Sequence, residues 1–339
     1  MYHITKNKNW LSQIASQKRN ISQQNFLLNL PHLPNYKFMR IAVLSTNPKL
    51  YSTQKLVKAI RNRGHEALVI NHLLCQVVIE EGQPTIMSNN QPLGLIDAII
   101  PRIGASATDY GCAVVRQFEM MKVFTTVKSQ AILRSRNKLR SLQILSKAGV
   151  QIPKTVFSNE TKHLEELVKQ VGGPPVVLKF LEGTQGVGVV LAETIQGAKS
   201  TIEAFHGLKT NVLIQEYIAE AKGADVRVFV INNRVVAAMR RQGREDDFRS
   251  NLHRGGFAER VILTLEEEKA AIQAAKALGV KVAGVDLIQS NRGPMIMEVN
   301  SSPGLRGIEE TTGLNIADLI VAYIEEKIPS PDEGDLIGV

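Results

Sequence analysis

The chain has 339 residues, of which 44% are hydrophobic and 22% charged, and only two are cysteines. This length is sufficient for two or three domains with buried cores. No apolar run approaches the ~20 residues that a membrane-spanning helix needs. Cys75 and Cys112 have neither metal nor redox spacing, which fits a reducing compartment. We therefore expect a cytoplasmic globular protein with no membrane partner.

The net charge of +9 is unevenly distributed along the chain. Residues 1–38 contain five of the 41 basic residues and no acidic residue, so the remainder has 36 basic against 32 acidic residues. This small excess suits a small anionic substrate or an acidic peptide better than a nucleic-acid duplex. We find no nucleic-acid-binding motif and expect no direct nucleic-acid partner.

The first 38 residues are rich in Asn and Gln and have no sustained helical period. They are compatible with a disordered tail, a weak transit-like leader, or non-native sequence upstream of a start at Met39. We favour the last of these, because a clear strand begins at Met39, and we leave this leader out of the expected fold.

Strands and helices alternate from Met39 onwards. Strands at 40–45, 67–71 and 97–102, with helices at 52–63 and 108–121, predict a small Rossmann-like domain over 39–130. Its first turn lacks G-x-G-x-x-G, so dinucleotide binding is not expected.

Two further parts follow in the sequence. Residues 131–215 combine a basic helix at 137–148, a helix at 161–171, and a strand at 175–180 that leads into a glycine-rich loop. Strand 212–218 crosses the boundary into the last part, residues 216–328. This part contains strands 226–231 and 234–239, a helix opened by the capping box Thr264-x-x-Glu267, a hairpin, and a helix at 315–327. Residues 329–339 are a polar tail. The fold class is α/β and α+β.

The hairpin at 282–304 carries the strongest candidate site. Apolar runs at 285–288 and 295–299 flank the turn residues 290–294. A turn near Arg292 places Asp286 opposite Glu298, and Asn300 shares a face with Glu298 because strand side chains alternate. Two carboxylates and an amide suit Mg²⁺ or Mn²⁺. The alternative is that these are ordinary solvent-facing strand residues.

A lysine inside an apolar strand precedes the glycine-rich loop. Lys179 requires an anion if it is buried. Gly183, Thr184, Gln185 and Gly186 follow in a loop whose backbone N–H groups can approach a phosphate. It is not a Walker A loop, and by itself it could be a plain hairpin turn. Lys138 is a second candidate phosphate contact, or else a solvated surface lysine.

Two further segments have two interpretations each. Glu216, Tyr217 and Ile218 end an apolar strand, where the backbone could pair with adenine and Glu216 could accept its amine proton; a strand end reaching solvent is equally compatible. Asp225 and Arg227 share a strand face and could meet ribose and phosphate, or form a salt bridge across that face.

An arginine-rich stretch occupies residues 240–256. A charge run is usually a solvated face, but Asn251 and the glycines at 255–256 interrupt helical continuation. We therefore favour a loop that presents guanidinium groups to carboxylate or phosphate. The arginines are Arg240, Arg241, Arg244, Arg249 and Arg254.

Taken together, these motifs resemble an ATP-grasp ligase, and most closely the RimK family, which attaches glutamate to the C-terminus of a small-subunit ribosomal protein. The resemblance covers 39–339 and depends on six segments in order: PRIG (101–104), RQFEM (116–120), LEGTQGVGVVLAET (181–194), QEYI (215–218), DFRSNLHRGG (247–256) and MEVNSSPG (297–304). It implies an ATP-grasp fold preceded by a small Rossmann-like pre-ATP-grasp domain, with 131–215 as the lid subdomain and 216–328 as the subdomain with the metal site.

The resemblance also implies roles for the candidate residues. Lys138 and Lys179 would hold ATP phosphates beneath loop 182–188, Glu216 to Ile218 would form the adenine hinge, and Asp225 would meet the ribose. Arg249, Ser250 and Asn251 would line the nucleotide and acyl-phosphate site, and Asp286, Glu298 and Asn300 would bind two Mg²⁺ or Mn²⁺ ions. Two departures are the 38-residue leader and Asn137, which stands where an acid often precedes the phosphate lysine.

The implied reaction is ATP-dependent formation of an acyl phosphate, followed by attack of the glutamate amine. Arg249 and Arg240 would stabilise the tetrahedral oxyanion, and Arg102 and Arg116 would help to hold an acidic acceptor. The expected partners are free L-glutamate and a ribosomal protein with an acidic C-terminus. We expect a homo-oligomer, with a tetramer as one candidate state. The alternatives are a ligase for a small-molecule, poly-glutamate or carrier-protein acceptor, and a non-catalytic ATP-binding regulator.

Overall fold

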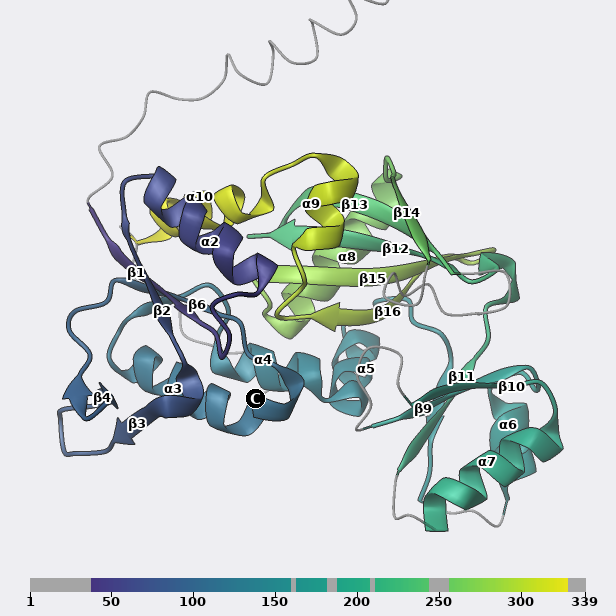
Figure 1. The fold of residues 1–339 in the computed structure, drawn as a ribbon. Coiled ribbons are helices and arrows are strands. Elements are labelled where there is room, and N and C mark those ends of the chain that lie inside the picture. Colours follow the sequence, from purple (N-terminus) through teal and green to yellow (C-terminus); the bar gives the residue numbers. More distant parts are fainter. Residues whose placement is uncertain (1–37, 160–162, 182–187, 208–210, 244–255, 329–339) are drawn as a thin grey trace, which may run out of the picture. The chain divides into compact units, whose positions relative to one another are not determined.

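The computed structural model describes residues 38–159, 163–181, 188–207, 211–243 and 256–328 (Figure 1). The described residues from Met39 onwards belong to one compact unit. No helix in the described ranges is long and apolar enough to cross a membrane.

The first part of this unit is built on a parallel sheet with the strand order β2-β1-β6-β7. Three short strands, β3 to β5, form a separate small sheet that the sequence did not reveal. Runs of two to four residues are too short to show the periodicity by which a strand is recognised. The elements are β1 (Arg40–Leu44), α2 (Tyr51–Asn62), β2 (Glu66–Ile70), η1 (His72–Leu74), β3 (Cys75–Val78), β4 (Thr85–Ser88), β5 (Gln91–Pro92), β6 (Ala98–Pro101), η2 (Ala105–Ala107), α3 (Thr108–Met120) and β7 (Phe124–Thr125).

A second sheet, with the order β10-β9-β11-β8, carries the expected phosphate lysine on β9. It has its own core, in which Val168, Leu178 and Phe180 are buried together. Helices α4 and α5, in contrast, contact α8 and β16 of the next part. The elements are α4 (Ser129–Arg136), α5 (Lys138–Lys147), β8 (Thr155–Phe157), α6 (Leu164–Gln170), β9 (Val176–Phe180), β10 (Val189–Ala192), α7 (Ile195–Gly207) and β11 (Val212–Glu216).

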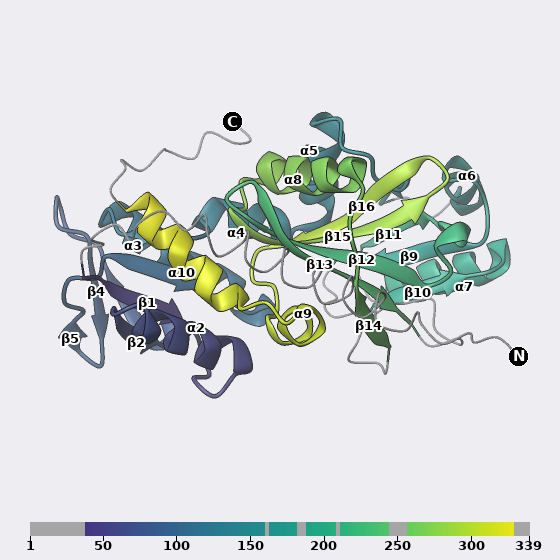
Figure 2. The same ribbon diagram turned by 90° about the horizontal axis from the view of Figure 1, so that it is seen from above.

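The third part is an antiparallel sheet with the order β14-β13-β12-β15-β16, and α8 covers one face of it (Figure 2). Helix α8 begins with the expected capping box of Thr264 and Glu267 and ends at Gly279, whose φ of 70° suits glycine. The elements are η3 (Ala219–Ala221), β12 (Ala224–Ile231), β13 (Arg234–Gln242), β14 (Phe257–Arg260), α8 (Leu265–Leu278), β15 (Val282–Ser290), β16 (Gly293–Asn300), α9 (Arg306–Thr312) and α10 (Ile316–Lys327).

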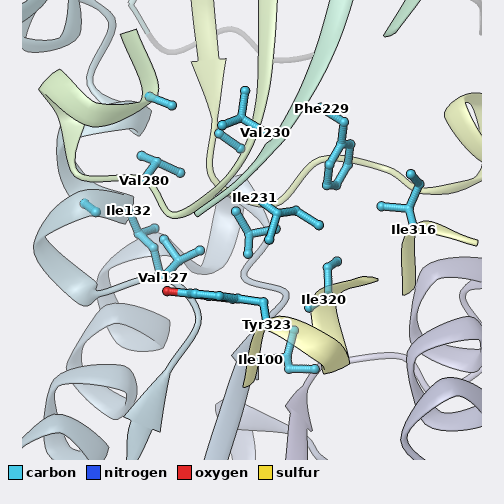
Figure 3. Packing of buried hydrophobic residues seen from close by; sticks show 14 of the residues in the cluster. Ile100, Val127, Ile132, Phe229, Val230, Ile231, Val280, Ile316, Ile320 and Tyr323 are labelled. Carbon is cyan, nitrogen blue, oxygen red and sulfur yellow. The ribbon is translucent and has the colours of Figure 1, made fainter. Parts of the chain in front are cut away.

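One hydrophobic core joins the first and third parts (Figure 3). Ile100 of β6, Phe229 of β12 and Ile320 of α10 belong to the same buried cluster. Tyr323 packs edge-on against Phe124 with ring centroids 5.8 Å apart. Full burial of each such side chain contributes about 1.5–3 kcal/mol. The loop between β16 and α9 also contacts the first part: the Pro303 carbonyl accepts from Arg102, and the Leu305 backbone N–H donates to Ser52 Oγ.

Candidate active site

The β15–β16 hairpin brings the two predicted metal-binding carboxylates together. Asp286 lies opposite Glu298, and Asn300 lies opposite Gly284. A bulge between Asp286 and Leu287 shifts the register by one residue, without which Met297 would face Asp286. The Asn300 side-chain amide donates to Glu298 Oε1 at 2.9 Å. The expected pairing of Asp286 with Glu298 is thus observed, and metal binding by these three side chains stays a prediction.

Asp286 is buried and already paired with two arginines. Arg227 donates to it through Nε at 2.7 Å and Nη2 at 2.6 Å, and Arg241 Nη2 lies 3.0 Å from Oδ2. Arg241 also donates to both oxygens of Asp225, at 2.7 and 2.5 Å. Burial acts to raise the pKa of Asp286, but the two guanidiniums outweigh it and hold the pKa below its ordinary value.

This network revises the expectations for Asp225 and Arg227. They do not pair with each other: Arg227 faces Asp286, and Asp225 faces Arg241. Ribose or phosphate would therefore have to compete with existing bidentate ion pairs for either side chain.

Glu298 differs from Asp286 in its surroundings. Its side chain is open to solvent, yet the protein atoms around it and the Asp286 carboxylate raise its pKa. Two carboxylates that oppose each other's ionisation, next to an amide oxygen, form a hard-oxygen set that a divalent cation would stabilise. No group of three His, Cys, Asp or Glu residues suited to a metal occurs in the described ranges. A metal here therefore depends on Asn300 as the third protein ligand.

The two predicted phosphate lysines lie in the same electrostatic environment. Burial lowers the pKa of Lys179 to about 8, with Lys138 adding to this effect and Glu298 opposing it. Burial also lowers the pKa of Lys138, whose Nζ donates to the Leu181 carbonyl at 3.0 Å. The carboxylate of Glu298 therefore interacts electrostatically with both lysines.

Asn137 has a structural role that the sequence did not reveal. Its side chain accepts from the Arg140 backbone N–H at 2.9 Å and caps the helix that begins at Lys138. The departure from an acid at this position thus leaves helix α5 with a capped start.

Glu216 of the predicted adenine hinge already accepts two hydrogen bonds within the protein. Both carboxylate oxygens of Glu216 are occupied, one by the Arg292 guanidinium and the other by the Lys154 backbone N–H at 3.1 Å. Each carboxylate oxygen can accept a further hydrogen bond, so an adenine amine would share Glu216 with these two donors, and the backbone of Tyr217 and Ile218 offers a second contact for adenine. Ile218 is buried and Tyr217 half-buried.

Arg240 lies on the wrong face of its strand for the predicted oxyanion role. Arg240 is opposite Val226, whereas Arg241 is opposite Asp225 on the face that carries Asp286. The reason is a bulge between Phe229 and Val230, because an unbroken register from the Ile231–Arg234 pair would have placed Arg240 opposite Asp225. Arg240 instead lies 3.6 Å from Glu259.

Seven predicted site residues lie outside the described ranges. They are Gly183, Thr184, Gln185, Gly186, Arg249, Ser250 and Asn251.

Arg102 and Arg116, the expected acceptor contacts, are in different environments. Arg116 is an exposed residue of α3, whereas Arg102 is half-buried and donates to the Pro303 carbonyl at 2.7 Å. The cationic neighbour of Arg102 is Arg136, which was not among the site residues predicted from the sequence. Burial and Arg136 lower the pKa of Arg102 to about 10.

Two family models together match most of the chain. The RimK PreATP-grasp domain matches residues 39–132, and the RimK-like ATP-grasp domain matches residues 135–324. The chain belongs to the RimK family of ATP-grasp ligases.

Relatives and solved structures agree with this family assignment. The chain is 60% identical over 289 residues to a probable alpha-L-glutamate ligase of Picosynechococcus sp., covering 85% of this chain and 96% of the relative. It is 57% identical over 290 residues to probable alpha-L-glutamate ligase 2 of Shewanella amazonensis, covering 86% and 96%.

The fold is similar to that of known ATP-grasp ligases. The structure of PsnB complexed with a minimal precursor matches with a TM-score of 0.68 at 23% identity, covering 86% of this chain and 99% of PsnB. D-alanine–D-alanine ligase from Bacillus anthracis matches with a TM-score of 0.59 at 19% identity, covering 86% and 97%. The expected ATP-grasp fold with its pre-ATP-grasp domain is confirmed.

This RimK-family protein is therefore an ATP-dependent carboxylate–amine ligase. Such a ligase needs a site for nucleotide phosphates, charge neutralisation for phosphoryl transfer, and room for two organic substrates. Lys138 and Lys179 beside the Asp286–Glu298–Asn300 set match the first two requirements.

Proposed function

We propose that the enzyme activates the C-terminal carboxylate of a small-subunit ribosomal protein as an acyl phosphate and joins it to the amine of L-glutamate. The observation that carries this proposal is the convergence of Lys138 and Lys179 with Asp286, Glu298 and Asn300. The alpha-L-glutamate ligase names of relatives at 57–60% identity support glutamate as the incoming amino acid.

The first step is phosphorylation of the carboxylate by ATP. Lys179 and Lys138 would contact the phosphate oxygens and spread the negative charge of the transferring group. The backbone of Tyr217 and Ile218 would hold the adenine. Asp286, Glu298 and Asn300 would hold magnesium or manganese, as two ions in this proposal, and bound metal would neutralise further phosphate charge. A neighbouring fold, PsnB, has been solved with Mg and ADP.

The second step is attack of the glutamate amine on the acyl carbon. The carbon–nitrogen bond forms, phosphate leaves with the oxygen that bridged carbon and phosphorus, and the amine releases its proton. Arg249 would stabilise the oxyanion of the tetrahedral intermediate. One such donor lowers the activation free energy by on the order of 3 kcal/mol.

The acceptor is tested by mass spectrometry of ribosomal proteins. Incubation with the enzyme, ATP and glutamate should add glutamate-sized mass increments to one small-subunit protein, and Glu298→Gln enzyme should add none. Phosphate release without labelling of a ribosomal protein would indicate a small-molecule or carrier-protein acceptor instead. ATP binding without ADP formation in the presence of every acceptor tested would favour a non-catalytic regulator.

A cytoplasmic location and a homo-oligomeric state, such as a tetramer, are further parts of this proposal. Light scattering coupled to size-exclusion chromatography would measure the oligomeric state directly.

A further inference from the structure

Two guanidinium groups meet beside the loop that follows the metal-site hairpin. Arg102 comes directly after β6 and donates to the Pro303 carbonyl at 2.7 Å. Arg136, the last residue of α4, donates to the carbonyl of Ile103, the residue next to Arg102, at 2.7 Å. Elements far apart in the sequence thus place two positive charges together.

In the part of the chain that the structure describes, neither guanidinium of this pair forms an ion pair, although the charge of Glu298 acts on Arg136 from a greater distance. Across the described ranges, neither Arg102 nor Arg136 has a carboxylate within ion-pair distance, and the printed acceptors of both are neutral carbonyl oxygens. The Arg136 Nε is buried without an acceptor there. Burial lowers the pKa of both arginines. Desolvated like charges are unfavourable unless an anion neutralises them, so a ligand that carries negative charge would relieve this arrangement.

The position of the pair in the parallel sheet also favours a ligand. In the order β2-β1-β6-β7, the chain passes from β1 to β2 on one side and continues to β6 on the other. Ligands of open α/β sheets bind beyond the carboxyl ends of the strands at such a reversal. Arg102 stands at the carboxyl end of β6, next to β1.

Close packing connects the pair to the reaction site. A Cβ added to Gly284 would lie 2.7 Å from the Pro303 Cβ and 3.8 Å from Arg227 Nε. Arg227 is bound to Asp286, so the loop that accepts from Arg102 packs directly against the carboxylate network. The same loop contains Ser301 and Ser302, whose hydroxyls are buried without partners in the described part of the chain.

We propose that Arg102 and Arg136 form a carboxylate-binding subsite, which holds a carboxylate of one substrate beside the reacting centre. This proposal rests on the proposed ligase function and deepens it. The planar guanidinium fork matches a carboxylate in two parallel hydrogen bonds. Free glutamate and an acidic acceptor peptide both carry this group, and the two sources can be separated kinetically.

The kinetic test compares Arg102→Gln, Arg136→Gln and Arg136→Lys with Arg61→Gln, an exposed arginine of α2. Loss of a charge-assisted hydrogen bond should raise KM for one carboxylate substrate about 10- to 100-fold, leaving KM for ATP within about twofold. Arg136→Lys should recover part of this loss, because it keeps the charge without the fork. A rise in KM for glutamate identifies free glutamate as the source, and a rise for the acceptor identifies the acceptor.

A binding measurement separates the subsite from the ligase function. Glutarate, which has no amine, and an acidic acceptor peptide are titrated by calorimetry into wild-type and variant enzyme saturated with ADP and Mg²⁺. Weaker binding of either probe to both Gln variants, with Arg61→Gln like wild type, supports the subsite even if no glutamate ligation occurs; in that case only the proposed function fails. Equal binding to wild type and variants, no binding to wild type, or a change confined to KM for ATP would overturn the subsite.

Discussion

Two charged regions beside the β16–α9 loop differ in how their charge is neutralised. At the end of the five-stranded sheet, Asp225 and Asp286 are matched by Arg227 and Arg241 within hydrogen-bond distance. On the other side of that loop, the guanidinium groups of Arg102 and Arg136 donate to the neutral carbonyl oxygens of Pro303 and Ile103.

This difference separates structural charges from charges that await a ligand. A matched buried pair can maintain itself, whereas unmatched buried charge is a cost that a bound ion or substrate offsets. Glu298 is open to solvent but also lacks an arginine ion pair: its carboxylate has Asp286 as a neighbour and Asn300 as its hydrogen-bond donor.

The largest effect is expected from Asp286→Ala. This change removes a proposed metal ligand and leaves Arg227 and Arg241 without their shared carboxylate. We expect turnover to fall below detection and the free energy of unfolding to fall by about 3–5 kcal/mol. Chemical denaturation together with an ADP-release assay measures both. Wild-type turnover would remove the metal assignment, and an unchanged unfolding free energy would show that the ion pairs are not structural.

Glu298→Gln should affect turnover alone. The amide keeps the size of the side chain and no arginine ion pair is lost, so Tm should stay within about 2 °C of wild type, corresponding to less than about 1 kcal/mol. Turnover should fall at least about 1,000-fold if Glu298 neutralises charge in phosphoryl transfer. Thermal melts and single-turnover kinetics test this contrast with Asp286, and an active Glu298→Gln enzyme would contradict it.

Lys179→Met should weaken ATP binding about 10- to 100-fold, because the change removes the half-buried cation that we propose contacts phosphate. The pH dependence gives a second check. With a pKa of about 8 in the ligand-free enzyme, Lys179 is protonated below that pH and loses its charge above it. The apparent Kd for ATP should therefore rise above pH 8 in wild type and much less in Lys179→Arg. Identical pH profiles for the two enzymes would assign the effect to another group.

Arg292→Ala should have a small effect. Its ion pair with Glu216 is largely solvent-exposed, and such pairs contribute about 0–1 kcal/mol. We expect KM for ATP to rise by no more than about fivefold, through a looser Glu216. A loss comparable to that of Lys179→Met would mean that Glu216 contacts the nucleotide directly.

Deletion of residues 1–38 should have the smallest effect. The family match begins at residue 39, and no residue of the proposed site precedes it. Activity within about twofold of wild type is expected, and loss of activity in a folded deletion protein would make the leader part of the enzyme.

The sequence predicted the metal-site hairpin better than the arginine positions, for a physical reason. Asp286, Glu298 and Asn300 were placed correctly because the turn at Asn291–Arg292 and the bulge together centre the register on Arg292. On β12–β13, the Asn232–Asn233 turn alone favours Arg240 opposite Asp225, and the bulge after Phe229 moves Arg241 there. The extra residue is Val236 of β13, which has no partner on β12. A bulge leaves no clear mark in a run such as Val-Val-Ala-Ala, so strand alternation could identify the arginines but not which one faces the site.

Contacts between distant segments were hidden for a different reason. Arg136 ends a short helix and Arg102 follows a strand, so neither has a periodic signal that joins them. Helix α4 was not predicted from the sequence, which indicated only the helix at 137–148; the Asn137 side chain caps the start of α5 and marks the boundary between the two helices. The Gly284–Pro303 approach depends on tertiary packing, which local spacing does not specify.

Isotope transfer tests the central claim, activation of a carboxylate as an acyl phosphate, most directly. The acceptor is prepared with ¹⁸O in its terminal carboxylate and incubated with enzyme, ATP and glutamate in unlabelled water. Release of one ¹⁸O into inorganic phosphate for each amide formed is the predicted result. Amide formation with unlabelled phosphate would contradict the acyl-phosphate route and the site built to support it.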